Sequence, residues 1–194
     1  MPRASAVLDN LLADHENLGR LVALLDRQPS LQASAMSPNI GLLVDVLFYL
    51  TRFPDVMHHP LEDRIVERLL ARGALDPQLG AELEAQHARI ARQGQDLMRD
   101  LEGAVREESM STDLLATNIR LYAERLRHNI AFEELALFPV ASRALQPEDW
   151  EAIAASTGPD SPDPLFDAQV QDRFVGLHRA IAQEANCGCE VPAL

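Results

Sequence analysis

Cysteine, aromatic residues and positive charge are all scarce in this chain of 194 residues. The two cysteines, Cys187 and Cys189, lie near the C-terminus with one residue between them, which excludes a disulfide framework. Asp and Glu outnumber Lys and Arg by 30 to 17, and the resulting net charge of −13 would repel phosphate groups. We therefore expect neither nucleic acid nor an anionic membrane surface as a partner.

Long apolar runs are missing as well, although hydrophobic residues make up 47% of the chain. No run approaches the ~20 residues that a membrane-spanning helix needs. The first residues, Met1 to Ser5, lead into an amphipathic pattern with acidic residues and not into a secretory signal, so we predict a cytoplasmic protein. Because no alternating strand pattern, internal repeat or low-complexity run is present either, we expect an all-α fold.

Four long segments repeat apolar residues at spacings of three and four, which is the period of an amphipathic helix. They cover approximately residues 5–28, 39–72, 77–101 and 113–145. Helices of this length joined by short loops predict an up-down-up-down four-helix bundle over residues 1–145.

Prolines and capping residues refine these boundaries. Proline is costly inside a helix unless a new helix begins just before it, so Pro54 and Pro60 predict a break near residues 53–57. Pro139 is expected to kink the fourth helix. Gly73 is a candidate C-cap of the second segment and Asp76 a candidate N-cap of the third.

Residues 146–194 are predicted to form a C-terminal extension. A short helix is expected over residues 151–155, a proline-containing linker over 157–164 and a weak helix over 167–184. These segments should either pack on the bundle or contribute to a homodimer contact. Cys187 and Cys189 could bind a soft metal or exchange disulfides, but we favour two incidental thiols in a polar chain end.

Residues that bind metals interrupt the apolar face of every predicted bundle helix. They are His15, then His58 and Glu62, then His87, and finally Glu133 with His128 one place off the face. Four helical residues turn about 400°, so the side chains of His58 and Glu62 lie only ~40° apart. His59 lies ~100° from His58, and we expect it beside the site or at the surface.

A lone histidine on an apolar face is more often a hydrogen-bonded core residue than a ligand. Buried histidine and glutamate must nevertheless be paired, hydrogen-bonded or bound to a metal. The recurrence of such residues on four helices favours one shared metal site, because imidazole and bridging carboxylate suit a pair of iron or manganese ions in a bundle core.

Several stretches together resemble the hemerythrin-like HHE cation-binding family over about residues 8–145. They are Asp14-His15-Glu16, Phe53-Pro54-Asp55, His58-His59-Pro60-Leu61-Glu62-Asp63, Glu84-Ala85-Gln86-His87, Phe132-Glu133-Glu134 and Leu137-Phe138-Pro139. The resemblance implies a four-helix bundle with a non-haem di-iron centre, bridged by two carboxylates and by an oxo or hydroxo species; manganese or zinc are the alternative metals. It places ligands at His15, His58, Glu62 and His87, and the second bridging carboxylate at Glu133.

The chain departs from the family pattern at one ligand position. The family usually has a histidine four residues before the second bridging glutamate, where this chain has Asn129, and the nearest histidine is His128. Five residues on a regular helix separate two side chains by ~140°, so His128 would need a local π-bulge to reach the metal. Otherwise His128 points away and Asn129 or a water takes the position. We favour His128 as the ligand.

Three functions are compatible with this pattern. The first is a di-iron protein that binds or senses a small diatomic molecule, oxygen or nitric oxide, or that handles iron. The second is an enzyme that reduces peroxide or nitric oxide at the same centre. The third is a bundle that has lost its metal and serves as an interaction module.

Overall fold

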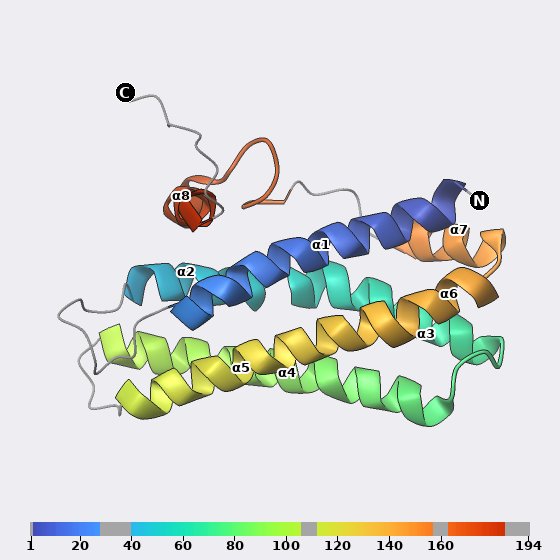
Figure 1. The fold of residues 1–194 in the computed structure, drawn as a ribbon, viewed down its shortest axis with the longest axis horizontal. Helices are drawn as coiled ribbons and strands as arrows, with labels where there is room; N and C mark the ends of the chain where they lie inside the picture. The colour runs from blue at the N-terminus through green and yellow to red at the C-terminus, as the bar shows by residue number, and fades with distance from the viewer. Residues whose placement is uncertain (1, 28–39, 106–111, 157–162, 185–194) are drawn as a thin grey trace.

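The computed structural model describes residues 2–27, 40–105, 112–156 and 163–184. Four helical rows run side by side along the length of the molecule, and each is antiparallel to the next (Figure 1). The rows are α1 (Pro2–Arg27), α2 (Ile40–Leu50) continued by α3 (His59–Ala71), α4 (Pro77–Val105), and α5 (Thr112–Phe132) continued by α6 (Phe138–Ala144). The predicted all-α, up-down-up-down four-helix bundle is confirmed.

The second and fourth rows are each interrupted by one π-helical turn. The first turn, η1 (Pro54–His58), joins α2 to α3, and the second, η2 (Glu133–Leu137), joins α5 to α6. In both, a backbone N–H bonds to a carbonyl five residues earlier, from His59 to Pro54 and from Phe138 to Glu133. The predicted break near residues 53–57 is confirmed, and the kink at Pro139 takes the form of η2.

Each π turn ends two residues before a proline, Pro60 in the second row and Pro139 in the fourth. A proline ring in a regular α-helix clashes with the carbonyl four residues earlier and leaves that carbonyl without its N–H partner. Here those carbonyls belong to Val56 and Leu135, in the middle of η1 and η2. The wider π turn relieves the clash while the row continues in the same direction.

The predicted caps are also present. Gly73 has a φ of +63°, and the N–H of Ala74 donates to the carbonyl of Leu69 over 2.9 Å, which ends α3 in a Schellman motif. The carboxylate of Asp76 accepts a bond from the N–H of Gln78 over 2.8 Å at the start of α4.

The bundle core consists of two apolar clusters with a polar layer between them. Every row passes from one cluster to the other, as α1 does between Leu11 and Leu18 and α4 between Leu83 and Ile90. His15 and His87 lie in these intervals, and both side chains are buried. The bundle therefore carries its buried polar residues in one layer, sealed by apolar side chains at both ends.

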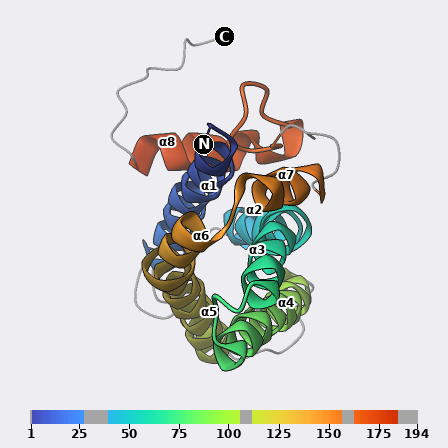
Figure 2. The same cartoon turned by 90° about the vertical axis from the view of Figure 1, so that its right-hand side faces the viewer.

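Two further elements cover the bundle. Helix α7 (Pro147–Ser156) packs against α1 and α3, and its Trp150 is 2% exposed. Helix α8 (Val175–Glu184), which follows the short turn η3 (Asp172–Phe174), crosses the bundle axis and packs against α1 and α2 (Figure 2).

The α8 segment is fixed to the bundle by aromatic contacts and by one short hydrogen bond. The hydroxyl of Tyr49 donates to the carboxylate of Asp163 over 2.6 Å, and the ring of Tyr49 meets the edges of Phe166 and Phe174. Burial and the Asp163 carboxylate both raise the pKa of Tyr49 far above its usual range, so the phenol keeps its proton. The extension packs on the bundle of its own chain.

The helix expected over residues 167–184 is wrong in its first part. The carboxylate of Asp163 accepts bonds from the N–H groups of Leu165 and Phe166, and the N–H of Gln171 bonds to the carbonyl of Pro164. These contacts close a loop, and the α-helix begins only at Val175. The helix expected over residues 151–155 is longer than expected, extending over Pro147–Ser156.

Some expectations lie outside the described residues, among them Cys187, Cys189 and most of the linker over 157–164. Within the described ranges no helix combines the length and the apolar character needed to cross a membrane. The division into a bundle over residues 1–145 and an extension over 146–194 stays a prediction.

At Gly94, helix α4 lies very close to α5 and to the residue that follows α2. A Cβ at this position would lie 2.6 Å from Cγ2 of Thr51 and 3.2 Å from the hydroxyl of Tyr122. We expect Gly94→Ala to lower the free energy of unfolding by about 1–3 kcal/mol, because the neighbouring helices must move apart. Urea denaturation measures this change.

Gly19→Ala is the matched control, because nothing lies within 4 Å of a Cβ there. The alanine should stabilise helix α1 by up to about 1 kcal/mol through helix propensity alone. If both variants gained stability, the close packing at Gly94 would be contradicted.

Candidate metal centre

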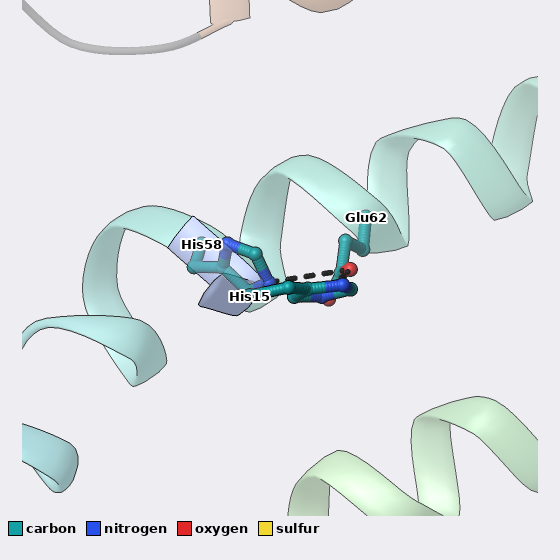
Figure 3. A group of neighbouring side chains, drawn as sticks. All are labelled: His15, His58 and Glu62. Carbon is teal, nitrogen blue, oxygen red and sulfur yellow. Dashed lines mark ion pairs between the residues drawn. The ribbon is translucent and has the colours of Figure 1, made fainter. Parts of the chain in front are cut away.

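Five of the six predicted ligands meet in the polar layer. His15, His58, Glu62, His87 and Glu133 are all at most 7% exposed, and they come from all four rows of the bundle. Figure 3 shows the imidazoles of His15 and His58 converging on the carboxylate of Glu62. His15, His58 and Glu62 form one group that could hold a metal ion, and His59, Glu62 and His87 form a second.

The two carboxylates divide their oxygens between the groups. Oε1 of Glu62 lies 3.4 Å from Nε2 of His15 and 3.3 Å from Nε2 of His58, whereas its Oε2 lies 3.5 Å from Nε2 of His87. The oxygens of Glu133 are divided in the same way. Its Oε2 lies 3.5 Å from Nε2 of His15, and its Oε1 lies 2.9 Å from Nε2 of His87. Two carboxylates that each present one oxygen to either side have the arrangement of bridging ligands.

Several buried atoms of this layer have no hydrogen-bond partner among the residues that the structure describes. Nε2 of His15, Nε2 of His58, both carboxylate oxygens of Glu62 and Oε2 of Glu133 are in this condition. An unpaired buried polar atom is costly, and a concentration of them on facing side chains needs a shared partner. Imidazole nitrogens and carboxylate oxygens are ligands for iron, manganese and zinc, so the residues fit a metal centre.

A carboxylate outside the layer orients each buried histidine. Nδ1 of His15 donates to Glu134 over 3.0 Å, and Nδ1 of His58 donates to Asp14 over 3.0 Å. Nδ1 of His59 donates to Asp55 over 3.1 Å, and Nδ1 of His87 donates to Asp63 over 3.0 Å. This bond fixes the tautomer and directs Nε2 into the layer. Metal-binding histidines in proteins usually have such a partner on the second nitrogen.

In the absence of a metal, the buried carboxylates raise the pKa values of the histidines around them. Burial alone would lower the pKa of His15, but its contacts with Glu133 and Glu62 outweigh burial and raise the pKa to about 9. Burial likewise opposes the charge on His58 and His87, and the neighbouring carboxylates still raise both pKa values to about 10. Burial would raise the pKa of Glu62, but the charge of His58 and the nearby imidazole of His15 hold it below its usual range.

His128 is the predicted ligand that the structure does not bring to the layer. Its side chain is exposed and lines a surface pocket of about 380 Å³ with Gln86, Leu121 and Arg125. The π turn η2 begins at Glu133, so the helix between His128 and Glu133 is regular and the two side chains diverge. Asn129 takes the inward position instead, 2% exposed, and its amide donates to Oε1 of Glu133 over 2.7 Å.

His59 is buried beside the predicted ligands, which is one of the two positions expected for it from the sequence. It is 5% exposed, and its ring stacks on the ring of His87 at a centroid distance of 4.3 Å. The layer is surrounded by four rows, so a side chain ~100° from His58 still faces inward, toward α4. Asp55, four residues before His59, is the sequence signal that indicates a buried and oriented His59 side chain.

The protein-family model of the hemerythrin HHE cation-binding domain matches residues 6–141 of the chain. The chain belongs to the hemerythrin HHE cation-binding family. No curated protein and no solved structure gives a significant match. In this hemerythrin-like domain the matched segment runs from inside α1 to inside α6, so it reaches into all four helical rows and contains the whole polar layer.

The protonated histidines predict that metal binding depends on pH. Ligand imidazoles must be neutral, but His15, His58 and His87 have pKa values of about 9 to 10 without metal and are charged at neutral pH. We expect the loading of the metal-free domain to release protons and the apparent metal affinity to rise from pH 6 to pH 9. Calorimetric titrations in buffers of different ionisation enthalpy measure the release, and titrations without any release would show that the histidines are neutral beforehand.

Proposed function

We propose that this hemerythrin-like domain binds two iron ions and uses them to bind or sense a small diatomic molecule, oxygen or nitric oxide. The observation that carries the proposal is the division of both buried carboxylates between two sets of histidine nitrogens. One ion would need one oxygen from each carboxylate. A second acceptor side on both carboxylates is explained by a second ion.

The residues of the chain have distinct tasks in this function. Glu62 and Glu133 would bridge the ions, and the histidines would bind through Nε2 because Nδ1 is held by a carboxylate. Phe138 stacks on His15 at a centroid distance of 5.4 Å and restricts the motion of its ring. When bound, an iron pair supplies a reversible coordination position and electrons for a diatomic ligand.

The apolar surroundings serve the same function. Leu11 and Leu83 lie on one side of the layer and Leu47 and Leu126 on the other, and none of them is more than 1% exposed. They exclude bulk water, which otherwise competes for open positions and promotes oxidation of ferrous ions. The burial also restricts access to molecules of a few atoms.

Metal content and reaction with gas test the proposal directly. We expect the full chain, purified without chelator, to contain about two iron ions, with near-ultraviolet charge-transfer bands in air. After anaerobic reduction, addition of oxygen or nitric oxide should change the spectrum reversibly. Rapid turnover of peroxide or nitric oxide would point to an enzyme, and a folded chain without stoichiometric metal would point to an interaction module; either result contradicts the proposal.

Glu62→Ala tests the bridging role. The substitution leaves buried cationic histidines without their main counter-charge, so we expect a loss of about 3–5 kcal/mol in the free energy of unfolding of the metal-free chain. We also expect the metal content to fall. Metal analysis and urea denaturation measure the two effects.

Glu67→Ala is the control on the same helix, because among the described residues Glu67 forms an ion pair only with the exposed Arg64 at the surface. Its stability should stay within about 0.5 kcal/mol of the unchanged chain, with the same metal content. An equal metal content in the Glu62 and Glu67 variants would mean that Glu62 does not bind metal.

A further inference from the structure

The polar layer has two halves, one around each pair of oxygens that Glu62 and Glu133 present. If only the five predicted residues are counted, the two halves have unequal numbers of imidazoles. Around Oε1 of Glu62 and Oε2 of Glu133 there are two imidazoles, His15 and His58. Around the other oxygen of each carboxylate there is one, His87. The second half would therefore hold its ion with a single nitrogen and two carboxylate oxygens.

Helix α5 does not supply the missing nitrogen. The inward position belongs to Asn129, whose amide N–H is already bonded to Oε1 of Glu133. This bond holds the carboxylate of Glu133 in place and points the NH2 group of Asn129 into the layer, and an amide NH2 group has no lone pair to offer a metal. His128 lines the surface pocket on the outer side of the same helix.

His59 lies where the second half lacks a ligand. A donor atom of His59, one of Glu62 and one of His87 all lie within 4.8 Å of one another. The rings of His59 and His87 are nearly parallel, with an interplanar angle of 14°. Because Nδ1 of His59 donates to Asp55, Nε2 is the nitrogen that remains for an ion.

The two histidines stand at the junction of η1 and α3. His58 is the last residue of η1 and His59 the first of α3, so their side chains leave the second row ~100° apart. His58 faces the ring of His15 on α1 at 4.9 Å, and His59 faces the ring of His87 on α4 at 4.3 Å. One turn of the second row thus contributes an imidazole to each half.

We propose that His59 is a metal ligand that replaces the histidine absent at position 129, and that Asn129 positions the carboxylate of Glu133 without binding metal. The proposal rests on the proposed function, because it requires two ions. Each half of the layer then has two imidazole nitrogens and two carboxylate oxygens. The competing explanation is a buried histidine that only stacks on His87.

A count of bound imidazoles on the unchanged chain tests the proposal. The full chain, labelled with ¹⁵N-histidine and loaded with Co²⁺, should show four strongly shifted and exchangeable imidazole N–H resonances. They are the Nδ1–H groups of His15, His58, His59 and His87, which their carboxylates protect. Three such resonances with two Co²⁺ per chain would overturn the role of His59 and leave the proposed function intact.

Variants locate the fourth ligand. His59→Ala should remove one resonance and reduce the Co²⁺ content from two ions to one. Adding Asn129→His to that variant should restore both, because it returns an imidazole to the same half from helix α5. His128→Ala, on the outer side of α5, should change neither value.

The outcomes separate the two proposals. Two Co²⁺ in His59→Ala would overturn the inference alone. One Co²⁺ or none in the unchanged chain would overturn the two-ion function and the inference together. Circular dichroism of each variant identifies loss of folding, and in that event the resonance count on the unchanged chain decides.

Discussion

Two carboxylates buried in the middle of an apolar bundle are the constraint on which this structure depends. Glu62 and Glu133 are fully buried, and an isolated carboxylate in such a place is strongly disfavoured. Four histidines, one amide and the outer carboxylates that fix the imidazoles are arranged around these two charges. In the metal-free layer, protonated histidines neutralise the two buried carboxylates. Bound metal ions would neutralise them instead.

The two π turns connect this constraint to the backbone. Regular helices through Pro60 and Pro139 would place a proline ring against the carbonyl of the preceding turn. The widened turns avoid that contact, and both lie beside a buried glutamate of the polar layer: η1 ends four residues before Glu62, and η2 starts at Glu133. π turns occur frequently at functional sites because they shift the direction of side chains without ending the helix. The turns that accommodate the prolines are therefore also the places from which side chains of the polar layer project.

Much of the fold could be predicted from the sequence because its signals are local. Apolar periodicity gave the rows of the bundle, and Gly73 and Asp76 marked their ends correctly. Five of the six predicted site residues meet in one layer, because a residue that interrupts an apolar face must lie in the core. The loop before α8 was missed because the side chain of Asp163 and the backbone of Pro164 hold it through contacts that no periodicity reveals.

The failures at the site have a geometric origin. The choice between His128 and Asn129 depended on whether a π turn lay before or after Glu133, and the sequence pattern does not give that register. The position of His59, beside the site or at the surface, stayed open because an angle measured on one helix does not show what the neighbouring rows present. Helix α4 brings His87 to face it, and this contact between different rows decides its burial.

The carboxylates of the layer also determine which charge it accommodates best. Glu62 and Glu133 and the four outer acids Asp14, Asp55, Asp63 and Glu134 together bring six negative charges to the histidines. Two divalent ions in the layer would leave an excess of negative charge, whereas two trivalent ions would balance it. Electrostatics of this kind stabilise the oxidised form of a metal pair and lower its reduction potential, although solvent screens the outer acids in part. Six of the 30 acidic residues of the chain thus lie in or beside this one layer, where their charge favours bound cations of high charge.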